Sequence, residues 1–207
     1  MKKIICVVLC TLMVASLVAC AGTGNGGGGG ASQTNLTGTT DGILTKIVDG
    51  VAEAGVETPF VMPPLQVMAD SSEFDIGLST DDFNRLVDDA YSSIAAISTF
   101  AHQISVIKAN SAADATEIMS IISSNGGFDP NKWICVWPQN ASVIRSGEYV
   151  LLAASRNDIV EAAIDTFTTQ AGAGNVSSVN RFWEHEGGEW EGGDDGGIGI
   201  LPAPIVP

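Results

Sequence analysis

Basic side chains are scarce in this sequence of 207 residues. Lysine and arginine together number 9 against 24 aspartates and glutamates, which gives a formal net charge of -15. A surface with this excess of negative charge repels phosphate backbones and anionic lipid headgroups. We therefore expect no nucleic-acid partner, and high solubility is the plainest consequence of the charge.

Histidine and cysteine, which supply much of the nucleophilic and metal chemistry of proteins, are also scarce. The sequence has two histidines, His102 and His185, and four cysteines. It has no Gly-x-Ser-x-Gly elbow, no His-Glu-x-x-His, no phosphate-binding loop and no Cys-x-x-Cys pair. A triad of His102 with a serine and an aspartate gains no support from spacing. We predict no catalytic residues, no cofactor and no metal site, and the sequence favours a protein that is not an enzyme.

Acidic residues form two clusters that could in principle bind a cation. Asp81 and Asp82 follow Thr80, the expected cap of a helix, and there they stabilise the positive end of the helix dipole. Their spacing lacks the Asp-x-Asp-x-Asp-Gly loop of calcium sites. Around His185, acidic residues alternate with glycines from 184 to 197, a composition typical of a solvated tail. Neither cluster is therefore predicted to bind a metal specifically.

A long apolar run occurs only at the N-terminus. It extends from Ile4 to Val18 after two lysines, and it is shorter than the ~20 residues of a membrane-spanning helix. The run ends in Leu17-Val18-Ala19-Cys20, which resembles the lipobox of bacterial lipoproteins. The resemblance implies that residues 1–19 are a signal peptide and that Cys20 carries the lipid. An ordinary signal peptide and an uncleaved anchor are the alternatives.

Removal of residues 1–19 would leave 7 basic residues against 24 acidic ones, a formal charge of -17. Cys6 and Cys10 would be lost with the signal peptide and Cys20 would be lipidated, which leaves Cys135 as the one free thiol. No intramolecular disulfide is then available. Since Ile134 and Val136 flank Cys135, we interpret it as a small buried hydrophobic residue rather than a nucleophile.

Composition divides the rest of the chain into three parts. Residues 20–40 are the lipidated cysteine and a Gly-rich tether, whose random-coil span of roughly 25 Å would keep the domain close to the membrane. Residues 41–172 form the predicted domain. Residues 173–207 are an acidic, Gly- and Pro-rich tail that we expect to be flexible. Its apolar end, Ile198–Pro207, is either disordered or docks on the domain or on a partner.

The domain should begin with an amphipathic helix from Asp41 to Val51, where apolar residues recur at helical spacing. Residues 58–67 contain three prolines and are predicted to be extended, as an edge strand would be. After them, Phe74, Ile76 and Leu78 alternate with polar residues.

Two similar units follow, each a strand pair and a helix. The first pairs residues 91–100 with 102–109 and continues into a helix capped by Ser111. The second pairs 142–145 with 148–155 and continues into a helix capped by Asn157. The repeated order predicts an α+β fold with a four-stranded, mainly antiparallel sheet from two β-β-α units and with helices packed on one face.

Four segments of this domain carry a family resemblance: residues 101–109, 114–122, the Trp133 segment with Pro138, and 147–152 with the helix that follows. They resemble a domain-of-unknown-function family of lipid-anchored proteins from Gram-positive clostridia. The matching segments cover roughly residues 75–170 and consist mostly of core and turn residues. The resemblance implies the fold and a location on the outer face of the cytoplasmic membrane, and it implies no catalytic residue.

The segment between the two units contains Trp133 and Trp137 on either side of Cys135. Paired tryptophans on a connection can stack on sugars or bind a partner, and we take them as the candidate binding surface. The alternative is that both belong to the core, since they share one strand parity.

We therefore expect an extracytoplasmic lipoprotein that is a non-catalytic binding or interaction module at the cell surface. Its partners would be the membrane, through the lipid on Cys20, and a protein or wall component. An enzyme or enzyme accessory acting on cell-wall material is the alternative, and a structural or assembly subunit is a third class.

Overall fold

The computed structural model of the chain describes residues 34–133 and 136–184. The predicted signal peptide, Cys20, Cys135 and His185 lie outside these residues. Within the described part of the chain, no helix is long and apolar enough to cross a membrane. The α-helices are α2 (Thr40–Glu53), α3 (Ser72–Ile76), α4 (Thr80–Leu86), α5 (Ala112–Asn125) and α6 (Asn157–Ala171), and the short 3-10 helices are η1 (Pro130–Lys132) and η2 (Ala173–Asn175).

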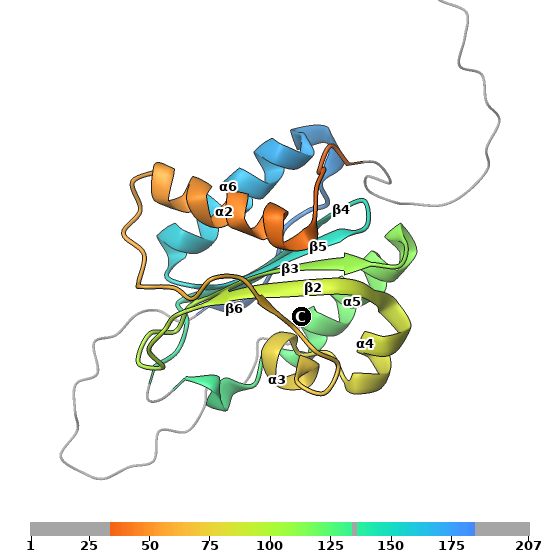
Figure 1. Cartoon of the computed structure of the whole chain (residues 1–207), viewed down its shortest axis with the longest axis horizontal. Coiled ribbons are helices and arrows are strands. Elements are labelled where there is room, and N and C mark those ends of the chain that lie inside the picture. The colour runs from red at the N-terminus through yellow and green to blue at the C-terminus, as the bar shows by residue number, and fades with distance from the viewer. Residues whose placement is uncertain (1–33, 134–135, 185–207) are drawn as a thin grey trace, which may run out of the picture.

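An antiparallel sheet forms the centre of the fold (Figure 1). The prediction of four strands is wrong, because the sheet has six in the order β1-β2-β3-β5-β4-β6. Two short edge strands account for the difference: one lies in the proline-rich segment, and the other lies in the segment predicted to be tail. The strands are β1 (Leu65–Gln66), β2 (Val87–Ile94), β3 (Gln103–Ala109), β4 (Asn140–Ser146), β5 (Tyr149–Ser155) and β6 (Asn180–Glu184).

Helices cover both faces of the sheet, so the prediction of helices on one face is also wrong. Side chains of α3, α4 and α5 share one buried cluster with alternate sheet residues such as Ile107 and Leu152. Side chains of α2 and α6 share a second cluster with the intervening sheet residues, such as Val106 and Leu151. Figure 1 shows α2 and α6 above the sheet and α3, α4 and α5 below it.

The handedness of the connections explains this arrangement. The helix α5 leads from β3 to β4 and α6 leads from β5 to β6, and both connections move across the sheet in the same direction. The strands β3 and β5 run in opposite directions. Two crossovers of the same hand must then place their helices on opposite faces. The β-β-α order therefore recurs along the chain without producing a two-fold repeat in space.

Local signals fix several helix ends. The Ser111 hydroxyl accepts a hydrogen bond from the Asp114 amide, as predicted, and Gly126 ends α5 in the left-handed conformation. Ser79, rather than Thr80, caps α4 by accepting from the Asp82 amide. Phe74 and Ile76, which alternate with polar residues, lie in the short helix α3.

The strand register defines two ends of the sheet. At one, which we call the Thr34 end, Thr34 lies beside Gly147 in the β4–β5 turn. At the other, the Glu184 end, Glu184 pairs with Asn140 and Asn140 pairs with Ser155. Ile94 pairs with Gln103 at this same end. The described chain therefore begins at one end of the sheet and finishes at the other.

Candidate functional site

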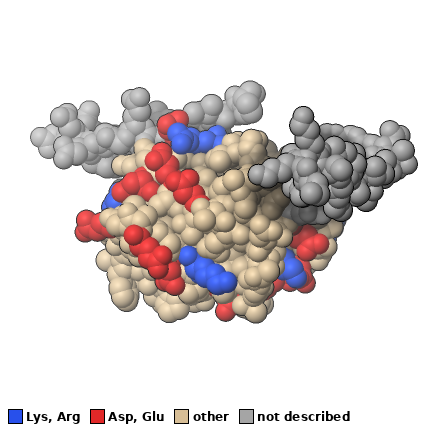
Figure 2. All heavy atoms as spheres, turned by 90° about the horizontal axis from the view of Figure 1, so that it is seen from above, with Lys and Arg blue, Asp and Glu red and all other residues tan. Residues whose placement is uncertain are grey.

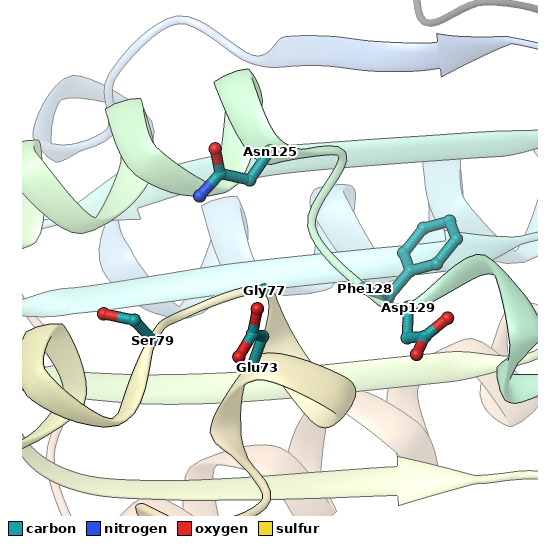
Figure 3. Close-up of a pocket in the computed structure, with 6 residues that line it drawn as sticks. All are labelled: Glu73, Gly77, Ser79, Asn125, Phe128 and Asp129. Atoms are coloured by element: carbon teal, nitrogen blue, oxygen red, sulfur yellow. The ribbon is translucent and has the colours of Figure 1, made fainter.

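A polar cleft lies on the face of the sheet that carries α3 and α5 (Figure 3). Its volume is about 500 Å³, which is within the range of ligand pockets. Residues of α3, of the α3–α4 turn, of the end of α5 and of the loop after α5 form its walls. The lining residues are Glu73, Gly77, Ser79, Asn125, Phe128 and Asp129.

Two glycines allow the walls of the cleft to approach each other. Gly77 and Gly127 both have a left-handed backbone, with φ of 70° and 71°. A Cβ on Gly77 would lie 2.9 Å from the backbone carbonyl carbon of Gly127, and one on Gly127 would lie 2.5 Å from the Phe182 ring. The sequence predicts a helix stop at residues 125–127, and Gly126 alone accounts for it. Gly127 serves the close approach, which sequence spacing does not reveal.

The polar groups of the cleft are mainly hydrogen-bond acceptors. Ser79 and Asp129 are partly committed to local structure, since Ser79 bonds Asp82 and Asp129 accepts from the backbone and side chain of Asn131. In Figure 3 the amide of Asn125 points from α5 toward the α3–α4 turn, and Glu73 lies below it. The described residues that line the cleft include no lysine or arginine. A cleft with two carboxylates and no basic residue suits a ligand that carries a cation or several hydrogen-bond donors.

A buried lysine holds the segment after the cleft against α3. Lys132 Nζ lies 3.1 Å from Asp75 Oδ1 and 3.2 Å from the Asp75 carbonyl oxygen. It also lies 5.3 Å from the centre of the Phe74 ring, and the Lys132 side chain is 5% exposed. Burial lowers the pKa of Lys132, and the nearby Asp75 carboxylate opposes that shift. Since its ammonium group is fully engaged with α3, Lys132 supports the cleft rather than reacting there.

His102 is buried on the opposite face of the sheet. Its Nδ1 lies 3.1 Å from the Ser155 hydroxyl, and both residues are almost fully inaccessible to solvent. Burial lowers the pKa of His102 to about 4, with a smaller contribution from the charge of Arg156. The structure thus pairs a histidine with a serine that sequence spacing did not identify. No cleft residue joins this pair, and a substrate has no access to it.

The described residues contain no group of three or more histidine, cysteine, aspartate or glutamate side chains placed to hold a metal ion. The Asp82 carboxylate accepts hydrogen bonds from the Ser79 hydroxyl at 2.8 Å and from the Arg85 guanidinium at 2.7 Å, as expected for an acidic residue at a helix start.

The structure places Trp133 and Trp137 in one aromatic group. Trp133 is buried, and its ring meets the Phe128 ring edge-on at 4.9 Å. Trp137 is half-buried and stacks on Trp183 at 5.9 Å. Trp183 Nε1 donates to the Pro138 carbonyl oxygen at 2.9 Å. Of the two predicted residues, Trp137 therefore offers more surface to a partner, and their binding role stays a prediction.

Sequence reasoning did not identify the cleft or the contribution of Trp183. The only local signal for Trp183 is the aromatic pair Phe182-Trp183 in a polar stretch. The cleft residues come from two segments, 73–79 and 125–129, and no pattern along the chain relates one segment to the other.

Comparison of the chain with protein-family models, curated proteins and solved structures gives no match. The family resemblance drawn from the sequence therefore stays a prediction.

Proposed function

We propose that this protein is a lipid-anchored, non-catalytic binding module on the outer face of a Gram-positive cytoplasmic membrane. The lipobox-like segment at Cys20 and the Gly-rich stretch after it support the anchored location. The ligand-sized cleft supports a binding role.

One contrast carries the proposal. Among the described residues, the lining of the cleft offers acceptor groups and no histidine, cysteine or lysine, while His102 and the buried Lys132 are both engaged elsewhere. Carboxylates and serine can also act as acid-base or nucleophilic groups, but Ser79 and Asp129 are already hydrogen-bonded to Asp82 and Asn131, which favours binding over catalysis. We propose a ligand with an ammonium group or a similar cationic donor, because Glu73 and Asp129 supply negative charge without a basic partner in the lining.

Thermal unfolding of the full chain against amines, divalent cations, wall sugars and basic peptides tests this role. A ligand at 100 times its Kd adds ~2.7 kcal/mol to the folded state. For a domain of this size we expect Tm to rise by roughly 5–10 °C. Glu73→Gln should remove most of the shift.

Glu161→Gln is the matched control, since Glu161 is exposed on α6, on the opposite face of the sheet. A shift that is equal in both variants would place binding outside the cleft. A shift with wall sugars alone, accompanied by their cleavage, would favour the alternative of an enzyme or accessory acting on wall material.

The location is tested separately. Cys20→Ser should move the protein from the membrane fraction to the soluble fraction, because two acyl chains anchor stably and the variant would carry none. A variant that remains with the membrane although residues 1–19 have been removed would contradict lipid anchoring without affecting the cleft.

A further inference from the structure

Exposed apolar side chains gather at the Glu184 end of the sheet. Phe60 is 79% exposed, Met62 38%, Ile97 58% and Phe100 46%. They come from two segments that lie side by side, since the Ala96 amide donates to the Phe60 carbonyl oxygen at 2.9 Å. We call these four residues the end patch. Exposed apolar side chains that come together on neighbouring segments are typical of interaction sites.

A shallow groove continues from the end patch. It has a volume of about 370 Å³ and lies between α2 and the proline-rich segment before β1. Thr45, Val48 and Asp49 of α2 form one wall, and residues 60–64 form the other. The groove is mostly apolar and includes a phenylalanine and two prolines, which suits an extended proline-rich segment.

The chain itself supplies such a segment at the same end of the sheet. The strand β6 finishes with Glu184, which pairs with Asn140 at this end. Residues 185–197 follow and are rich in glycine and acidic residues, and Ile198–Pro207 is apolar with three prolines. Prolines restrict a segment to the extended polyproline conformation and so lower the entropy cost of docking.

The distances permit docking within one chain. Four strand spacings separate β6 from β2, or roughly 19 Å. The 13 residues from 185 to 197 can reach ~45 Å when extended. A connection of this length also gives an effective concentration on the order of 1 mM, so weak apolar contacts suffice.

We propose that Ile198–Pro207 packs in cis on the end patch and the adjoining groove. The segment covers the exposed side chains of Phe60 and its neighbours, and the acidic residues before it remain in solvent. This contact is independent of the cleft, which lies on the opposite face of the sheet.

Photocrosslinking in intact cells tests the contact. The photoreactive p-benzoylphenylalanine replaces Phe60 in the full chain, and the irradiated protein is digested with trypsin. Because no lysine or arginine follows Arg181, residues 182–207 form one peptide. We expect this peptide joined to peptide 47–85 in a product of single-chain mass. Leu201→Asp should reduce the yield about tenfold, the factor that loss of one buried leucine contributes to an equilibrium.

Phe74 is the matched control position. It is 45% exposed and lies in the same tryptic peptide, but it belongs to α3 on the other face of the sheet. Equal yields from positions 60 and 74 would overturn the proposal. So would a product of twice the chain mass, which would show a second copy on the patch, or a product joined only to another protein.

Discussion

At the scale of single residues, the burial of His102 lowers the stability of the folded protein. The side chain is buried with one ring nitrogen bonded to Ser155, and Nε2 has no hydrogen-bond partner within the described residues. The neutral imidazole tolerates this site far better than the charged form, because burial opposes the charge and Arg156 repels it. The side chain therefore ties stability to pH.

We predict that stability falls as the medium becomes acidic. The pKa of His102 is about 4 in the folded protein and ~6.5 in an unfolded chain, so the unfolded state takes up the proton first as pH drops below 6.5. Between pH 7 and pH 5 this linkage should remove about 2 kcal/mol from the free energy of unfolding. Urea denaturation at the two pH values measures it.

His102→Gln keeps a hydrogen-bonding group for Ser155 but cannot take up a proton. Its pH-dependent loss should be smaller by the same amount. Parallel losses in both proteins would mean that His102 is not held neutral in the folded state.

Residue-scale features were predictable where the cause is local. The cap at Ser111 follows from a serine before an apolar repeat, and the structure has it. Trp133 contacts Phe128, a neighbour along the chain, yet its burial depends on the whole core cluster around it. The pairing of His102 with Ser155 requires β3 and β5 to be neighbours, which no local pattern specifies.

At the scale of elements, α2 and α6 approach each other closely at Gly50. A Cβ at this position would lie 2.5 Å from Cγ2 of Thr166 and 2.7 Å from its hydroxyl oxygen. Gly50 is therefore needed for the helix contact even though glycine is a poor helix former.

We predict that Gly50→Ala destabilises the protein despite its better helix propensity. Alanine gains about 1 kcal/mol in a helix, while overpacking costs roughly 1–3 kcal/mol. The net loss should be about 1 kcal/mol, measured by urea denaturation. The double variant Gly50→Ala/Thr166→Ala removes the two closest contacts and should be more stable than Gly50→Ala alone. If the two substitutions were additive, the helices would not be in contact there.

The order of elements was predictable and their layering was not. Both strand pairs and the helices after them were expected in the right order, since apolar periodicity marks them and Ser111 caps α5. The predicted cap at Asn157 is wrong, because Asn157 is the first residue of α6 and the preceding Arg156 makes no side-chain cap hydrogen bond. The predicted number of strands was wrong because β1 has only two residues and β6 follows a glycine-containing stretch. The prediction of which face each helix covers was wrong because it depends on the handedness of the crossovers. Handedness can be applied only when strand order is known, and strand order depends on pairing between distant segments.

At the scale of the whole molecule, negative charge dominates. Figure 2 shows acidic side chains spread over the α2 and α6 face with few basic ones between them. The described ion pairs are largely exposed, except that of Lys132, so each contributes little. Repulsion among the remaining carboxylates therefore destabilises the folded state.

We predict that moderate salt stabilises the protein. Raising the ionic strength from about 0.01 M to 0.15 M shortens the Debye length from ~30 Å to ~8 Å and screens this repulsion. Tm should rise by roughly 2–4 °C, equivalent to about 1 kcal/mol. Lys46→Glu adds negative charge on the exposed side of α2 and should enlarge the rise in Tm with salt. A Tm that falls with salt would show that attractive pairs outweigh the repulsion.

The central strands β3 and β5 are protected from local opening. Both edges of β3 and β5 are paired, and side chains on both of their faces are buried. Their amide hydrogens can exchange with solvent only when the whole domain opens, whereas β1 and β6 can detach alone. Opening therefore proceeds from the edges inward and leaves a persistent β3–β5 ladder. Any occupant of an edge should slow amide exchange there without altering the slowest-exchanging amides at the centre.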